Sequence, residues 1–335
     1  MAKVSRRVYI SGLIFVLIFL ALGATTFAWF TLAEFSQLNN LNFSVSSGSE
    51  LSISLDENGE YSDEILSSDI KSRIGKIQLG NLTSIDGKNL YVLNDDFSLS
   101  KEEYKKLQKN KFIEITFFFR AIPENVTVEN PIIGVYLSDH NKLAKYTEIE
   151  QKGTFVVSKG VYFNADVNYY SIDLKEDGTN YYKAGEKSKH YASDAIMISF
   201  EDNSNGNTII YDLNAKEGHN YNDGYSNDIS QLKGAASYYY NKTGKNPGLG
   251  DSRTAKLGSF ALFNDVKNPE VVTSNYDMMI CTLKESSTDK GVYYGSSTVR
   301  IWVEGFDADC FNAILSDQIM TQFSFRFGYY SNNNR

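Results

Sequence analysis

Hydrophobic and polar positions alternate along most of the chain beyond residue 35. In LNFSVSSGSELSISL, residues 41–55, two alternating runs flank a Ser-Ser-Gly-Ser break. An alternation with a period of two is typical of a β-strand that has one buried face. Similar runs recur between connections rich in Asn, Asp, Gly and Ser, and they include KFIEITFFFRA, NPIIGVYLSD, DAIMISF, NTIIYDL, STVRIWVEGF and QIMTQFSFRF. The pattern predicts about a dozen strands.

We therefore expect a mainly β protein, an antiparallel β-sandwich of the jelly-roll type with a few short helices. The stretch YSDEILSSDIKSRI, residues 61–74, could form one of these helices. Ser100 followed by Glu103 matches a capping box, which predicts another helix from about Lys101. The segment 164–250 is the most polar part of the chain, so we expect long surface loops there.

An uncharged run from Val8 to Ala33 follows a basic start that contains Lys3, Arg6 and Arg7. The run is 26 residues long, and about 20 apolar residues suffice to cross a bilayer as a helix. We expect a hydrophobic N-terminal helix with its basic end in the cytoplasm and everything after Glu34 exported.

Two interpretations of this segment stay open. In the first it is a secretory signal, with Thr26 and Ala28 as the small residues before a cut at Trp29. In the second it stays as a transmembrane anchor, and Trp29 lies at the outer interface. The expected organisation is a signal or transmembrane segment over 1–34, an extracellular β-sandwich domain over 35–328 and a polar tail over 329–335.

Charge and composition exclude some classes of function. The net charge of the 335-residue chain is -8, and an acidic protein is a poor candidate for binding nucleic acid. The two cysteines, Cys281 and Cys310, cannot form a disulfide scaffold, and we favour two buried small side chains over a pair. The three histidines fall in loop-like sequence without a His-Glu-x-x-His motif, so no zinc site is expected.

Two acidic stretches resemble cation loops only in part. Residues 201–212 match the spacing of a calcium loop, but strands instead of helices flank them, which favours a β-hairpin with an Asn/Gly turn. Asp307 and Asp309 are better explained by a tight turn. We assign no catalytic residue, metal site or cofactor, and we do not expect an enzyme.

Aromatic residues supply the remaining candidates. In the pairs Tyr169-Tyr170 and Tyr181-Tyr182 one ring is expected to face the core and the other the solvent. Tyr238, Tyr239 and Tyr240 lie beside a Gly/Asn-rich loop and form a candidate recognition surface, because amphipathic rings are enriched at such surfaces. Trp302 shares a strand face with Arg300 and Glu304, yet we expect its large ring to be buried.

The two ends of the chain resemble a known family. GATTFAWFTLAEFSQLNNLNFSVSSGSELSIS is similar to the start of the TasA/camelysin-type surface and biofilm-matrix proteins of Gram-positive bacteria, whose export signals end in a Gly-Thr-aromatic-Ala-aromatic-Phe pattern. STVRIWVEGFDADCFNAILSDQIMTQFSFRF resembles the closing segment of proteins with that start. The resemblance implies a jelly-roll-like sandwich, a role in extracellular fibres or matrix, and cleavage by a dedicated signal peptidase.

These observations lead to one expected function and two alternatives. We expect a non-enzymatic exported cell-surface or matrix protein, membrane-anchored or secreted, that could self-assemble by strand addition. Its partners would be the membrane through the N-terminal segment, other copies of the chain or cell-wall components, and not nucleic acid. The alternatives are a carbohydrate- or ligand-binding module that uses the tyrosine-rich loops, and a secreted hydrolase with an unrecognised site.

Overall fold

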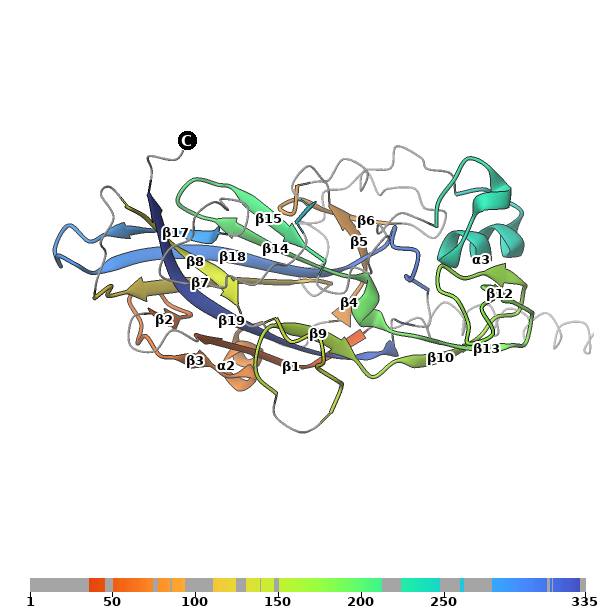
Figure 1. Ribbon diagram of the computed structural model, residues 1–335, viewed down its shortest axis with the longest axis horizontal. Coiled ribbons are helices and arrows are strands. Elements are labelled where there is room, and N and C mark those ends of the chain that lie inside the picture. Colours follow the sequence, from red (N-terminus) through yellow and green to blue (C-terminus); the bar gives the residue numbers. More distant parts are fainter. Residues whose placement is uncertain are drawn as a thin grey trace, which may run out of the picture. The chain divides into compact units, whose positions relative to one another are not determined.

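The computed structural model describes residues 36–45, 51–74, 78–84, 86–93, 111–124, 131–138, 140–147, 151–212, 224–247, 260–261, 279–311, 314 and 316–331. The chain divides into two compact units, Met1–Glu34 and Phe35–Arg335. Every described residue belongs to the second unit, which is mainly β (Figure 1). The expected N-terminal helix and the cleavage residues Thr26, Ala28 and Trp29 lie outside the described residues, as does the helix expected from Lys101.

Fifteen strands form one connected sheet. They are β1 (Ser36–Val45), β2 (Leu51–Ser54), β3 (Glu64–Ile65), β4 (Gln78–Leu79), β5 (Asn81–Ser84), β6 (Leu90–Val92), β7 (Ile113–Ala121), β8 (Pro131–Ser138), β9 (Phe155–Ser158), β14 (Ile196–Asp202), β15 (Thr208–Tyr211), β16 (Phe260–Ala261), β17 (Met279–Glu285), β18 (Tyr293–Glu304) and β19 (Gln318–Ser331). The main path runs β16-β15-β14-β18-β17-β8-β19-β1-β3.

Two small two-stranded sheets and four short helical segments complete the described structure. β10 (Val161–Asn164) pairs with β13 (Lys187–His190), and β11 (Tyr169–Tyr170) pairs with β12 (Tyr181–Tyr182). The helical segments are α2 (Ser67–Ile74), η3 (Ala192–Ala195), η4 (Ile229–Gln231) and α3 (Gly234–Thr243). The helix expected within residues 61–74 is therefore confirmed as α2, whose Ile70 is buried.

Most strand pairs are antiparallel, as expected, but the sheet is mixed. β1 pairs in parallel with β19, β5 with β18, and β15 with β16. A parallel pair needs a long crossover connection, and for β1 and β19 that connection is nearly the whole domain. The purely antiparallel arrangement that we expected is thus corrected, because the first and last strands of the domain lie side by side and run in the same direction.

Two further expectations about the chain's organisation differ from the structure. Within 164–250, β14 and β15 match the expected strands DAIMISF and NTIIYDL, but the polar stretches expected as loops also contain β12, β13 and α3 (Figure 1). β19 runs to Ser331, beyond the expected domain end at 328, and its Tyr329 is buried. Hydrogen bonding to β8 carries the strand to this point, since Ser331 is in register with Pro131.

Phenylalanine rings form the centre of the core. Phe43 of β1 lies 4.2 Å from Phe117 of β7 between ring centroids, and 5.1 and 5.9 Å from Phe323 and Phe325 of β19. Phe200 of β14 packs edge-on against Phe323 and Phe325. Aromatic pairs of this kind add roughly 0.5–1.5 kcal/mol each beyond the burial of their area. The cluster ties together strands that are not hydrogen-bonded neighbours.

The end of β18 is buried on both faces. Val299, Ile301 and Val303 belong to the main core, whereas Trp302 on the opposite face is 0% exposed and packs with a second cluster that includes Met197. The expected burial of Trp302 is confirmed. Its indole Nε1 donates a hydrogen bond to Glu304 Oε2 at 3.1 Å.

The two buried charged side chains on this face of β18, Arg300 and Glu304, have different kinds of partner. Arg300 binds Glu114 and Glu201 through its guanidinium, at 2.6 and 2.8 Å. Among the described residues no cation pairs with Glu304; its carboxylate accepts hydrogen bonds from Trp302 Nε1 and the Phe306 backbone N–H. Burial raises the pKa of Glu304 to about 7, and these hydrogen bonds only partly oppose that effect.

Replacing Trp302 should strongly destabilise the domain. Trp302→Ala is expected to lower the free energy of unfolding by about 3–5 kcal/mol, because it leaves a cavity and removes the donor to Glu304. Trp302→Phe keeps most of the ring volume and should lose less. Urea unfolding followed by fluorescence or circular dichroism measures both values, and an unchanged midpoint for Trp302→Ala would show that the ring does not support the core.

Glu304 should make stability depend on pH. Its pKa is higher in the folded chain than in the unfolded one, so its proton stabilises the fold at low pH and this stabilisation is lost as pH rises through about 7. The difference corresponds to about 3 kcal/mol. Glu304→Gln should therefore gain stability relative to the wild type between about pH 5 and about pH 8. Urea midpoints at both pH values test this, with exposed Glu60→Gln as the control; parallel pH trends in wild type and Glu304→Gln would contradict it.

Candidate functional site

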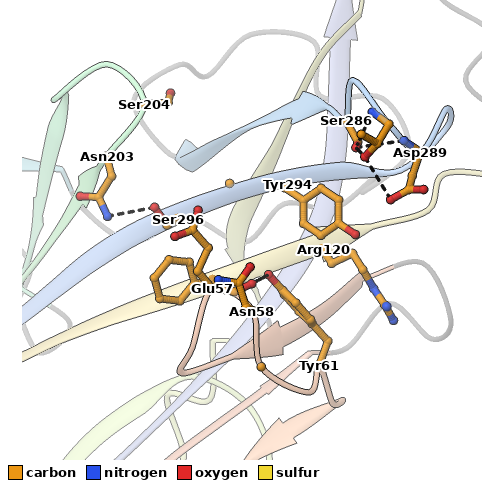
Figure 2. A pocket seen from close by; sticks show the side chains of 14 residues that line it. Glu57, Asn58, Tyr61, Arg120, Asn203, Ser204, Ser286, Asp289, Tyr294 and Ser296 are labelled. Carbon is orange, nitrogen blue, oxygen red and sulfur yellow. Dashed lines mark hydrogen bonds between the residues drawn. The ribbon is translucent and has the colours of Figure 1, made fainter.

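A pocket of about 700 Å³ lies where strand ends and turns of the large sheet converge (Figure 2). We call it the β7–β18 pocket. Its floor is formed by β7 and the start of β18, and its walls by the turns that follow β2, β14 and β17. The volume falls within the range of small-molecule sites, roughly 300–1,000 Å³.

Strand register explains which side chains form the floor. Arg120 is directly opposite Tyr294, and Phe118 is directly opposite Ser296. Residues opposite each other in an antiparallel pair point to the same side of the sheet, as do residues two apart along a strand. These four side chains therefore share one face. Phe117 and Phe119 alternate with them and are buried on the other face, in the core.

Two tyrosines meet in the pocket. Tyr61, from the turn between β2 and β3, lies edge-on to Tyr294 with 6.1 Å between ring centroids (Figure 2). The Tyr61 hydroxyl donates to the Glu57 backbone oxygen at 3.2 Å. Burial and the nearby Tyr294 raise the pKa of Tyr61, so its hydroxyl stays protonated at neutral pH. Tyr294 as a residue is 36% exposed.

Arg120 is the cation of the pocket. Its guanidinium carbon lies 5.2 Å from the Tyr61 ring centroid, a cation–π contact. Arg73 and Arg300 bind carboxylates, but within the described ranges no carboxylate pairs with Arg120, and its buried Nε has no hydrogen-bond partner. Arg120 as a whole is only half-buried and lines the pocket, so its guanidinium can donate hydrogen bonds to an acceptor that a ligand supplies.

Asp202 fixes one wall of the pocket. Its carboxylate accepts hydrogen bonds from the backbone N–H and the hydroxyl of Thr282 on β17, at 2.8 and 2.6 Å, and from the backbone N–H of Ser204. Asn203 donates from its side chain to the Ser296 hydroxyl at 3.1 Å. The β14–β15 turn is thereby held against both β17 and β18.

The opposite wall is the β17–β18 turn, which is organised around one hydroxyl. Ser286 Oγ accepts hydrogen bonds from the backbone N–H groups of Thr288 and Asp289, at 3.2 and 3.1 Å. Both walls are therefore set before any ligand arrives. Figure 2 shows Asn203 and Ser286 on opposite sides of the Tyr294 ring.

The acidic stretches that we weighed as cation loops have structural roles. Residues 196–211 form the expected hairpin, in which β14 and β15 pair antiparallel and Gly206 has a φ of 77°. Asp307 Oδ1 accepts from the Asp309 backbone N–H at 2.8 Å, which confirms the tight turn. In the part of the chain that the structure describes, no three His, Cys, Asp or Glu side chains gather to hold a metal ion.

The tyrosines 238–240 lie on α3 and not in a loop. Tyr238 donates to Asp166 Oδ1 at 2.9 Å and packs against Phe163 and Phe311, whereas Tyr240 packs against a different cluster. Residues two apart on a helix point in different directions. The structure thus does not bring Tyr238, Tyr239 and Tyr240 together as one surface, and their role in recognition stays a prediction.

Tyr169 and Tyr170 follow the expected alternation, whereas Tyr181 and Tyr182 are both half-buried. Tyr169 is buried and stacks on Tyr182 at 5.2 Å, while Tyr170 is exposed and contacts Tyr181. Burial raises the pKa of Tyr169 to about 12. The prediction of one inward and one outward ring is confirmed for Tyr169 and Tyr170.

One histidine expectation is wrong. His190 is not in an exposed loop; it lies on β13, is buried, and its ring is 4.4 Å from that of Phe311. Its Nε2 is 2.9 Å from Ser188 Oγ, and the Tyr169 hydroxyl donates to that same Oγ. This serine–histidine pair is enclosed by aromatic rings, so we assign it a structural role. His219 lies outside the described residues.

Cys281 and Cys310 are both buried and both free, as we favoured. Burial raises the pKa of each thiol well above its usual value, so neither is a reactive thiolate.

Comparisons with protein-family models, curated proteins and solved structures give no match for this chain. Among the described residues, no helix has the length and apolar character needed to cross a membrane.

Sequence reasoning missed Tyr61, Arg120 and Tyr294. A signal for part of the site was present, because the alternation in FIEITFFFRA places Phe118 and Arg120 on the face opposite Phe117 and Phe119. The neighbour of that face could not be read from the sequence, since Tyr61 and Tyr294 are brought there by pairing between distant segments.

Asp202 should stabilise the wall of the pocket. Asp202→Asn replaces one accepting oxygen with an amide that cannot accept, which leaves donors such as those of Thr282 unpaired and should cost about 1–3 kcal/mol. The same change at Asp177, an exposed turn residue that caps Thr179, should cost much less. Urea unfolding measures both, and hydrogen exchange at residues 203–205 should speed up only in Asp202→Asn. Equal losses at the two positions would contradict this role.

Proposed function

We propose that this chain is a non-enzymatic, exported cell-surface or matrix β-protein, held at the membrane by its N-terminal segment or released from it by cleavage. The observation that carries the proposal is the position of β1. It begins at Ser36, immediately after the uncharged segment and Glu34, and its Leu41 and Phe43 are buried in the core. A chain built this way has almost no linker between an export segment and a folded domain.

The core supports the finer fold as part of this proposal. Phe43 on β1 contacts Phe117 on β7, and Phe325 on β19 contacts Phe119 on β7. These rings join strands that are separated in the hydrogen-bonding order, which is what the interior of a sandwich requires. A jelly-roll-like sandwich is also what the resemblance of the chain's ends to TasA/camelysin-type proteins implies.

Self-assembly by strand addition would use the outer edge of β1. One edge of β1 pairs with β19 along nearly its whole length. On the other edge, β4 pairs at Ser36 and Gln37 and β3 pairs at Phe43 and Ser44. Between them, Ser67 at the start of α2 binds the backbone of Leu41 and the side chain of Asn42. A strand from a second copy could replace this local cover.

Export is tested with a reporter fused to residues 1–40. The reporter should appear outside the membrane, and replacing Lys3, Arg6 and Arg7 with Glu should block or invert insertion, because the basic flank sets orientation. Intact mass of the protein from its native cell then separates an anchored chain that starts at Met1 from a released chain that starts at Trp29. A reporter retained in the cytoplasm by the native segment would overturn the proposal.

The same native preparation tests self-association. Size-exclusion chromatography at increasing concentration should show larger species for the chain that starts at Trp29. A monomer at every concentration would remove strand addition from the proposal and leave export unaffected.

A further inference from the structure

We propose that the β7–β18 pocket binds a saccharide unit that carries a single carboxylate, such as a uronic acid residue. The inference rests on side chains that the sequence analysis did not select, and it is independent of how the chain is exported. It is argued from four properties of the pocket: its construction, its aromatic ring, its polar walls and its unpaired guanidinium.

The construction favours a ligand site over an incidental surface hollow. The floor is set by the register of β7 and β18, and the two walls are fixed by hydrogen bonds through Asp202 and Ser286. A pocket whose walls are already ordered loses little entropy when it binds a ligand.

The exposed ring of Tyr294 offers a platform for a sugar. One side of a pyranose ring presents C–H groups, and these pack against the electron-rich face of an aromatic ring. Tyr61 stands edge-on to Tyr294 at an interplanar angle of 65°, which keeps the Tyr294 ring in place. Arg120 covers Tyr61, so Tyr294 is the ring on which a sugar would stack.

The walls carry groups that match sugar hydroxyls. Amides of Asn58 and Asn203, the hydroxyl of Thr288 and the carboxylates of Glu57 and Asp289 line the pocket. A sugar hydroxyl both donates and accepts hydrogen bonds, and this set contains donors, acceptors and groups that do both. Figure 2 shows Glu57, Asn58, Asn203 and Asp289 around the tyrosine pair.

Arg120 specifies the charge of the ligand. A guanidinium presents its N–H groups as a planar fork that fits a carboxylate with two parallel hydrogen bonds. In the described part of the chain no carboxylate takes this place at Arg120, in contrast to Arg73 and Arg300. A carboxylate on the ligand would therefore complete an ion pair that the chain leaves open.

The two acidic side chains of the pocket limit the charge that fits. Glu57 and Asp289 lie on exposed turns, and they would repel a phosphate-rich or sulfate-rich polymer. They can instead accept hydrogen bonds from sugar hydroxyls. One carboxylate beside several hydroxyls is thus the ligand chemistry that satisfies Arg120 without placing multiple charges against these two acids.

The test begins with the full chain in detergent on an array of acidic saccharides, paired with neutral analogues. Isothermal titration calorimetry then compares methyl galacturonoside, which carries one carboxylate, with its methyl ester, which keeps the ring hydroxyls and removes the charge. We expect the wild type to prefer the acid, with an affinity that falls as salt rises. Arg120→Gln should weaken binding of the acid about tenfold or more and abolish the preference for it over the ester.

Matched variants measure the contributions of the Tyr294 ring and the Arg120 charge separately. Tyr294→Ala should weaken acid and ester alike, because it removes the stacking surface and keeps the cation. Lys187→Gln and Tyr170→Ala change an exposed cation and an exposed tyrosine outside the pocket, and both should bind as the wild type does. Urea midpoints of all four variants confirm that each one is folded.

Any one of four results would overturn the proposal. If the protein binds none of the acidic saccharides on the array, the pocket is not a site for an acidic saccharide. Equal affinity for acid and ester, or unchanged binding by Arg120→Gln, would show that the pocket does not recognise the carboxylate. Competition by inorganic phosphate as strong as that by galacturonate would show a general anion site instead. None of these results bears on export, which the reporter fusion tests separately.

Discussion

The pairing of β7 with β18 is the constraint on which the rest of this domain depends. The register runs from Tyr293 opposite Ala121 to Ile301 opposite Ile113. It assigns one face of both strands to the core and the other to solvent, turns and the pocket. A shift of one residue would exchange the two faces, so that Phe117 and Phe119 would leave the core and Arg120 would enter it. The aromatic core and the β7–β18 pocket therefore lie on opposite faces of the same pair of hydrogen-bonded strands.

From Ser297 to its end at Glu304, β18 is buried on both of its faces. There the polar side chains must be satisfied inside the protein, and each one finds a different solution. Arg300 is held between two carboxylates. In the described part of the chain Glu304 has hydrogen-bond donors but no cation, and burial raises its pKa. One strand thus contains both a paired and an unpaired buried charge within five residues.

The sequence predicted the parts of this fold that depend on local pattern. Period-two alternation predicts most of the long strands. Other local sequence patterns predict the Asn/Gly turn and the α2 helix. Trp302 was correctly expected to be buried. Local sequence pattern does not predict pairing between distant segments. It does not show that β1 lies parallel to β19, or that Tyr61 packs against Tyr294. His190 was misjudged because its polar neighbours suggested a loop, whereas the rings that bury it come from residues such as Phe311.

The parallel pairing of β1 with β19 also has a consequence for how the chain acquires its structure. The strand made first lies against the strand made last, so the sequence separation between the partners is close to the maximum that the domain allows. Closing so long a loop is entropically costly, and contacts between distant segments slow folding. Until the 14 residues of β19 have appeared, Leu41 and Phe43 lack the strand they pack beside. The sheet therefore stays incomplete until β19, the last described strand, has emerged.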